Sequence, residues 1–75
     1  MNQLWLLHRW NRNINWDEVS CFVIRAPSEA DARVLAATNP GDEHAETWLD
    51  PTRSRAERLL DDGPTEVIVR DFRAG

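Results

Sequence analysis

The chain has 75 residues, a formal net charge of −4 and a single cysteine, Cys21. A chain of this length forms one domain, at residues 1–75, and buries only about 60–65% of the surface that its unfolded form exposes. The negative charge argues against non-specific nucleic-acid binding, which needs basic surface. The single cysteine excludes an internal disulfide and fits a reducing compartment. We see no signal peptide and no apolar run of about 20 residues, so we expect a cytoplasmic protein without a membrane span.

Residues 3–9 (QLWLLHR) predict the first strand. Side chains alternate along a strand, so Leu4 and Leu6 share one face and Trp5 and Leu7 share the other. Both faces are largely apolar, which predicts a strand that is covered on both sides.

The connection that follows, residues 10–17 (WNRNINWD), is rich in asparagine and too long for a tight hairpin turn. It carries Trp10, Arg12 and Trp16, and Arg9 comes directly before it. Tryptophan and arginine are the residue types that dominate protein interfaces, and the same mixture can stack on unpaired bases. These four residues are therefore candidate binding residues, with simple packing of the indoles as the alternative.

Residues 19–26 predict the second strand, antiparallel to the first. Its alternate side chains are apolar on both faces until Arg25, which is typical of a strand buried on both sides, so we expect it in the middle of the sheet. Pro27 ends the strand because proline has no amide hydrogen for the ladder. Cys21 lies among apolar residues and is interpreted as a small buried hydrophobe.

Residues 28–38 predict the main helix. Ser28 can cap its first turn, with Asp31 three residues on, and Glu29 can pair with Arg33. The expected apolar stripe is Ala30, Val34 and Ala37, with Leu35 beside them.

The stretch from Gly41 to Glu46 is acidic, and a flexible loop explains it better than a metal site does, so we expect no metal and no cofactor. Trp48 follows as an apolar anchor; we interpret it mainly as core and also count it among the candidate binding residues.

Asp50 followed by proline predicts the start of a short second helix that ends near Leu60. Its arginines would lie on the exposed side, and the first of them, Arg53, is a further candidate binding residue. Residues 66–72 predict the last strand.

Together these elements predict an α+β domain: a small three-stranded sheet with one main helix and one short helix, in the order β-β-α-α-β. The last strand can be antiparallel or parallel to its neighbour. The first helix can cover only one face of a sheet that is apolar on both. The other face needs the Trp48 loop and the second helix, or another chain, so we expect either a homodimer or a protein partner, with a self-covered monomer as the alternative.

Four stretches resemble a family of small uncharacterised proteins of actinobacterial phages and their GC-rich hosts: FVIRAPSEADARVLAA, GDE at 41–43, WLDPTRS at 48–54 and VIVRDFRAG at the end. The likeness covers about residues 22–75. The family pattern often has a cysteine soon after the serine of the WLDP-type motif, where this chain has Arg55 and Ala56, so no role of that thiol carries over. The resemblance implies a phage or prophage origin and an accessory role, and it supplies no activity.

Nucleophilic triads, phosphate-binding glycine loops and paired zinc-ligand motifs are absent from the sequence, so we do not expect an enzyme. The first hypothesis is a small phage-type accessory protein that acts by protein–protein binding in the host cytoplasm. The alternatives are single-stranded nucleic-acid binding through the Trp10–Trp16 loop, and a structural component of the virion.

Overall fold

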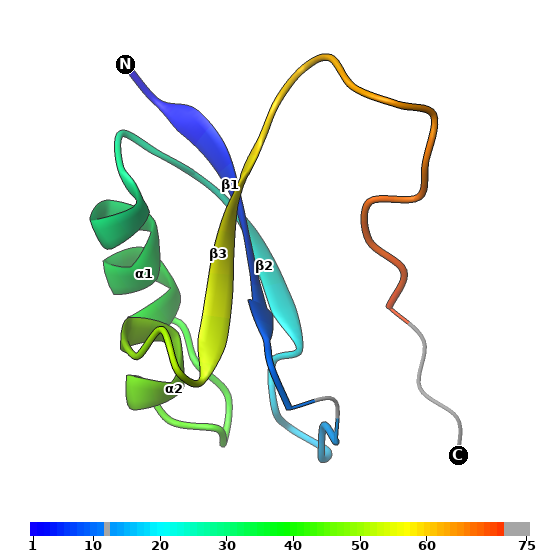
Figure 1. Ribbon diagram of the computed structural model, residues 1–75. Coiled ribbons are helices and arrows are strands. Elements are labelled where there is room, and N and C mark those ends of the chain that lie inside the picture. The colour runs from blue at the N-terminus through cyan, green and yellow to red at the C-terminus, as the bar shows by residue number, and fades with distance from the viewer. Residues whose placement is uncertain (12, 72–75) are drawn as a thin grey trace.

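The computed structural model describes residues 1–11 and 13–71, which form a three-stranded sheet with two helices packed on one side (Figure 1). The order β-β-α-α-β confirms the predicted α+β class. The elements are β1 (Gln3–Arg9), β2 (Cys21–Ala26), α1 (Glu29–Ala37), α2 (Glu46–Leu49) and β3 (Ser54–Leu59).

The sheet has the strand order β2-β1-β3, and β1 is antiparallel to both neighbours. The antiparallel pairing of the first two strands is confirmed, but the prediction that β2 lies in the middle is wrong. Leu6 and Leu7 point to opposite faces of β1 and are 5% and 0% exposed, whereas Val23 on β2 is 57% exposed. Both strands are apolar on two faces, so residue type alone did not distinguish the central strand from the edge strand.

Helix α1 begins as the sequence predicts. The Ser28 side chain accepts a hydrogen bond from the Asp31 backbone N–H at 3.2 Å, which satisfies one of the free amides of the first turn. Glu29 and Arg33 form the predicted ion pair, with Arg33 Nε donating to Glu29 Oε2 at 3.0 Å.

The buried side of α1 differs from the predicted stripe. Ala32, Arg33 and Ala36 are buried, while Val34 and Leu35 face outward. The two alanines allow a close approach to the aromatic side chains of the sheet, and the arginine finds polar partners beneath the helix. A search for large apolar side chains therefore selects the wrong side of this helix.

The segment after Asp50 is a turn and a strand, not the predicted second helix. Helix α2 ends before Asp50, whose Oδ1 accepts hydrogen bonds from the Thr52 N–H at 2.8 Å and the Thr52 hydroxyl at 2.7 Å. This side chain therefore stabilises a turn instead of capping a helix. Ser54 and Ala56 then point toward the core and Arg55 away from it, which is the alternation of a strand.

The predicted last strand is also wrong in position. Residues 66–71 are in no strand, and Phe72 lies outside the described residues. The third strand is β3, twelve residues earlier in the chain, and it is antiparallel to β1.

The core lies between the sheet and the two helices. Trp48 of α2 is fully buried, and its ring meets Phe22 of β2 edge-on, with centroids 4.9 Å apart. An indole of this size buries about 200 Å², which corresponds to about 5 kcal/mol of transfer free energy before the entropy cost of ordering. The buried apolar residues of this cluster are Leu7, Ala26, Ala32, Ala36 and Trp48.

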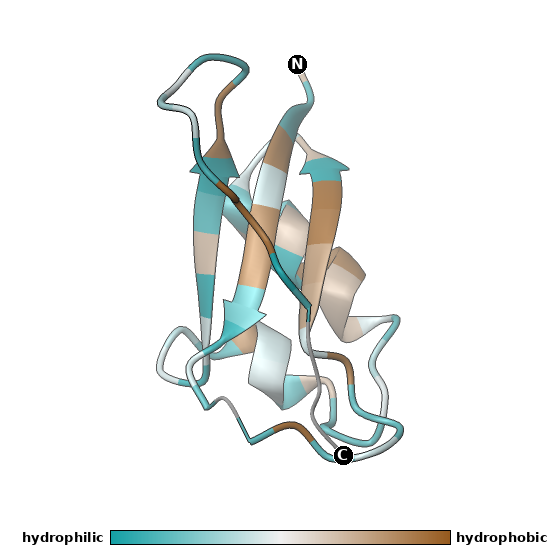
Figure 2. Cartoon of the chain, turned by 90° about the vertical axis from the view of Figure 1, so that its right-hand side faces the viewer, coloured by the Kyte–Doolittle hydropathy of each residue, from teal (hydrophilic) through white to brown (hydrophobic). Residues whose placement is uncertain are grey.

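Both helices therefore cover the same face of the sheet. We gave two alternatives for the opposite face, and the one in which the Trp48 loop and the second helix cover it is wrong. Trp48 and α2 pack beside α1, and the segment predicted as the second helix contains β3. Residues 66–71 cross that opposite face (Figure 2).

Candidate functional site

The sheet face that points away from the helices is the candidate functional site, and we call it the open face. Strand alternation and the two registers bring its side chains into three rows across the sheet. Its members are Leu4, Leu6 and His8 of β1, Cys21, Val23 and Arg25 of β2, and Arg55, Glu57 and Leu59 of β3. The β1 and β2 side of the open face is largely apolar, and the β3 side is charged.

The segment of residues 66–71 runs across the open face (Figure 2). Side chains of this segment and of the sheet line a groove. The groove has a volume of about 470 Å³ and is lined by Leu6, Cys21, Ile68 and Val69, among others. At its lower end, the Ser20 hydroxyl donates to Asp71 Oδ1 at 3.4 Å. This cover is partial, because Ile68 and Val69 stay exposed.

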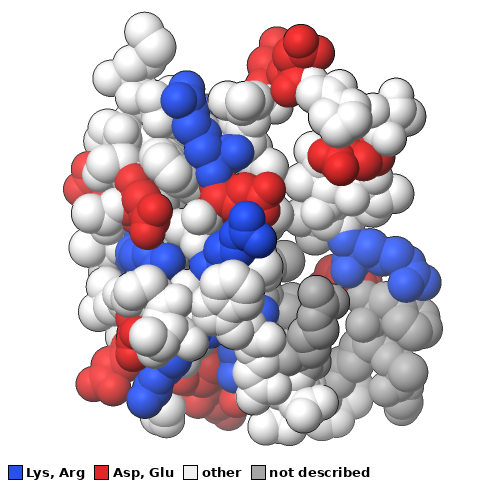
Figure 3. Space-filling view, viewed as in Figure 1, with Lys and Arg blue, Asp and Glu red and all other residues white. Residues whose placement is uncertain are grey.

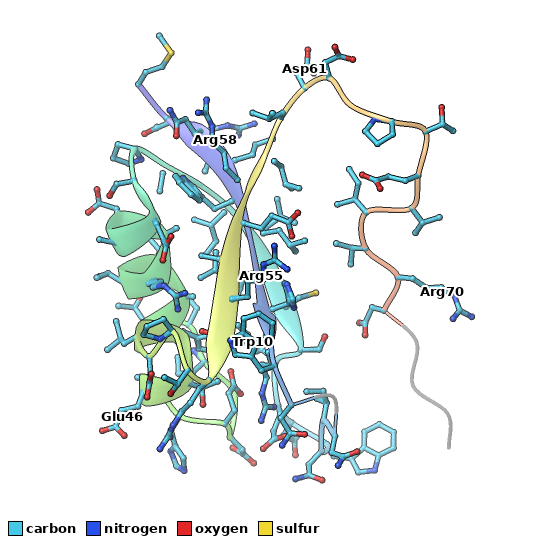
Figure 4. The ribbon with its side chains drawn as sticks, viewed as in Figure 1. Trp10, Glu46, Arg55, Arg58, Asp61 and Arg70 are labelled. Carbon is cyan, nitrogen blue, oxygen red and sulfur yellow. The ribbon has the colours of Figure 1, made fainter. Side chains whose placement is uncertain are left out.

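Trp10 lies at the end of β1 and forms the border of the open face (Figure 4). Its Nε1–H donates to the Pro51 carbonyl oxygen at 3.0 Å. The Arg55 guanidinium lies 5.9 Å from the ring centroid and His8 meets the ring edge-on, so the indole is held in one orientation. With 52% of its surface exposed, Trp10 combines a fixed position with access from solvent.

The structure gives Arg9 a structural role. Its Nη1 donates to Glu18 Oε1 at 3.0 Å, and both side chains are nearly buried. A hydrogen bond from the Asn15 backbone N–H and, to a lesser degree, the one from Arg9 hold the pKa of the Glu18 carboxyl below its ordinary value. Arg9 therefore closes the loop between β1 and β2, and its guanidinium is occupied there rather than available to a partner.

Trp16 is the second aromatic candidate in this loop, and 75% of its surface is exposed. It lies within the same connection as Trp10, at the end of the molecule where β1 finishes. Arg12, the remaining candidate of the loop, lies outside the described residues.

The structure places the last two candidate binding residues, Trp48 and Arg53, in different surroundings. Trp48 is fully buried in the core, so its selection as a binding residue is wrong and its interpretation as core packing is confirmed. Arg53 is exposed, with a long ion pair of 3.6 Å to Asp50. Together with Trp10 it lines a second, polar hollow of about 490 Å³ on the same end of the molecule.

The acidic loop turns one of its carboxylates inward. Glu43 accepts hydrogen bonds from the Val19 backbone N–H at 3.0 Å and from Trp48 Nε1–H at 2.6 Å. Burial alone raises the pKa of Glu43, but these hydrogen bonds outweigh it, so the pKa lies below its ordinary value. In the described residues, no three His, Cys, Asp or Glu side chains are grouped so that they could hold a metal ion.

His8 and Cys21 are direct neighbours across β1 and β2 on the open face. Among the described residues to which both belong, the structure shows no hydrogen bond between the His8 and Cys21 side chains. Cys21 is half-buried rather than buried, because it faces the groove and not the core. The arrangement on this face presents apolar contact area with cations at its border.

Sequence reasoning did not single out Val23 or Ile68 as site residues, and it assigned Arg55 to the exposed side of a predicted helix, where it could anchor an acidic partner, rather than to a strand. The alternation in β2 does place Val23 opposite the core side, so this exposed valine could have been found. The other two required knowledge that residues 54–59 form a strand and that residues 66–71 cross the sheet.

Comparison of the chain with protein-family models, with curated proteins and with solved structures found no match. Within residues 1–11 and 13–71, no helix is long and apolar enough to cross a membrane.

Proposed function

We propose that the protein is a non-enzymatic protein-binding module whose contact surface is the open face together with Trp10. The observation that supports it is the exposure of large apolar side chains on and beside the open face. Val23, Ile68 and Trp10 each keep more than half of their surface exposed. Large apolar side chains exposed near one another on a small domain are typical of an interaction site.

The residues around this surface suggest the chemistry of the partner. Arg25 and Arg55 are exposed on the open face, and Arg55 already contacts the Trp10 ring. Arginine and tryptophan combine a large contact area with directional hydrogen bonds, which is why they dominate interface energies. A protein surface with an apolar centre and carboxylates at its rim fits this arrangement.

We further propose a phage-type accessory role in the host cytoplasm, on the strength of the family resemblance alone. The partner is then a host or phage protein. If the chain is instead a structural part of the virion, it will copurify with particles, which an accessory protein does not.

Capture of proteins from an actinobacterial host lysate by the full chain tests the binding proposal. We expect at least one protein to be captured by the wild type and lost, by tenfold or more, with Trp10→Ala or Val23→Lys. Leu49→Ala is the matched control, because Leu49 is about as exposed as Trp10 but lies on α2, on the other side of the sheet. Retention of every captured protein by both open-face variants would count against this surface.

Single-stranded nucleic-acid binding is the second candidate, and the exposed Trp16 and the Trp10–Arg55 pair are the observations that favour it. The mixed arrangement of acidic and basic side chains weakens it, since Figure 3, which views the molecule from the β3 edge, shows both signs side by side with no broad basic area in that view. Tryptophan fluorescence titrated with an oligonucleotide at low salt decides the matter. An unchanged signal there removes this candidate, because phosphate attraction is strongest at low salt.

A further inference from the structure

The outer edge of β2 is open for strand pairing. Arg9 N–H donates to the Ser20 carbonyl at 3.4 Å, so Ser20 and every second residue after it direct their backbone groups toward β1. The backbone groups of Cys21, Val23 and Arg25 therefore point outward. Among the described residues, the structure shows no hydrogen bond to any of them. Arg25 is the one charged residue of β2, and the first proline, Pro27, comes after the strand has ended.

The other edge of the sheet is protected. On β3 the outward backbone groups begin with Ser54, whose N–H donates to the Asp50 carbonyl at 3.1 Å and whose carbonyl accepts from Arg33 Nη2 at 3.1 Å. Three of the five residues that follow Ser54 in the strand are charged, namely Arg55, Glu57 and Arg58, and Figure 4 shows the two arginines. Charges and covered backbone groups are the devices by which proteins prevent pairing at an edge, and β2 has neither in its middle.

We propose that the occupant of the β2 edge is a second copy of the chain, paired antiparallel about a two-fold axis at Val23. This axis pairs Val23 with Val23 of the second copy, and Cys21 with Arg25. In both pairs the residues direct their backbone groups outward, so they can exchange N–H···O=C bonds. Valine side chains on facing strands also pack well against each other.

Charge complementarity supports this register. Within each copy, the Asp71 carboxylate accepts a hydrogen bond from Ser20, which is next to Cys21. Pairing Arg25 with Cys21 of the second copy therefore brings the Arg25 guanidinium close to Asp71 of the second copy. Each copy contributes one such arginine and one such aspartate, so the contact is satisfied twice by symmetry. The joined sheet keeps both sets of helices on one side, because the two-fold axis is perpendicular to it.

The β2 edge is distinct from the open face, and a hetero-partner on that face is not needed for the strand pairing. The first test is the mass of the full chain in solution at about 100 µM, by light scattering after gel filtration. We expect twice the 8.7 kDa of one chain for the wild type and the mass of one chain for Val23→Lys. The two introduced ammonium groups would face each other at the axis, and we expect at least a tenfold weaker dimer.

Val34→Lys is the matched control, since Val34 is 53% exposed on α1 against 57% for Val23 on β2. It is expected to stay dimeric. A monomeric wild type, or equal dimerisation of the two variants, overturns the inference. A monomer would leave the proposed hetero-partner contact standing, because that contact is tested by capture.

The second test uses the one native thiol to read the register. Arg25→Cys places a thiol opposite Cys21 of the second copy, and a hydrogen-bonded pair has Cα atoms about 5.5 Å apart, within the range of a disulfide. Mild oxidation is expected to produce a covalent dimer from Arg25→Cys. Arg55→Cys, on the other edge strand, is expected to remain uncrosslinked. A dimer in which Arg25→Cys does not crosslink forms through another surface and refutes the proposed pairing.

Discussion

Arg33 is the residue that joins α1, α2 and β3, and its replacement is the strongest test of how this domain is held together. Its Nη1 donates to the Trp48 carbonyl at 2.8 Å and to the Ser54 hydroxyl at 2.9 Å, and its Nη2 donates to the Ser54 carbonyl at 3.1 Å. Its carboxylate partner, Glu29, contacts Arg33 Nε, and the Glu29 side chain is half-exposed.

Arg33→Met keeps a long side chain of similar shape and removes all of these donors. The Ser54 carbonyl loses its arginine partner inside the core, and the Trp48 carbonyl keeps only the long 3.5 Å bond from the Ser54 hydroxyl. A buried acceptor without a partner costs about 1–3 kcal/mol, so we expect a loss of about 3–5 kcal/mol. A domain of this length has a total unfolding free energy of about 4–11 kcal/mol, so the variant is close to unfolding.

The measurement is urea unfolding followed by tryptophan fluorescence and circular dichroism, at neutral pH. Glu29→Gln is the control: it breaks the half-exposed end of the same ion pair and leaves the buried hydrogen bonds intact, so we expect a loss of about 0.5 kcal/mol. If Arg33→Met falls within 1 kcal/mol of Glu29→Gln, the buried hydrogen bonds do not carry the stability that we assign to them.

Two further predictions concern the acidic loop. Because the pKa of Glu43 in the folded chain lies below the ordinary 4.5, its contribution to stability is present above that pH and is lost as the pH falls through the lowered value. When acid unfolding is followed by fluorescence, the stability of Glu43→Gln should therefore fall less with decreasing pH than that of the wild type. Glu43→Gln is also expected to be less stable at pH 7. Its amide has one oxygen, so it cannot accept hydrogen bonds from both the Val19 N–H and the Trp48 Nε1–H as the two carboxylate oxygens do. Equal acid sensitivity would contradict the assigned role. Gly41→Ala is expected to lower the urea midpoint sharply, since a Cβ there would collide with the Asp17 carbonyl oxygen; an unchanged midpoint would show that the loop can move aside.

Local signals were sufficient for β1 and for the start of α1, but not for the choice of the central strand or for the buried side of α1. The bounds of β1 follow from the apolar run that precedes the asparagine-rich connection, and the start of α1 follows from the Ser28 cap and the Glu29–Arg33 pair. These contacts join residues at most four positions apart, or depend only on the direction in which successive side chains point. They are therefore the same in any tertiary context that keeps the element.

The binding candidates divide in the same way. Tryptophan and arginine were recognisable as interface residues by type, but the sequence could not show that Arg9 pairs with Glu18 or that Trp48 fills the core. Trp10 is held at the sheet border by a hydrogen bond to the Pro51 carbonyl oxygen, which lies 41 positions away in the chain. Whether an aromatic side chain packs or projects depends on which elements meet it.

The sequence by itself determined the α+β class, the first hairpin and the main helix. Tertiary structure decided the rest: that β1 is central, that residues 54–59 form a strand, and that residues 66–71 cross the open face outside any strand. The apolar stripe at 52–60 fits helical spacing, and Val67, Ile68 and Val69 fit a strand, so local preference favoured the opposite assignment in both cases. Pairing with β1 and the hydrogen bonds from Arg33 to Ser54 hold residues 54–59 in the sheet, and these long-range bonds outweigh a local preference of a few tenths of a kcal/mol per residue.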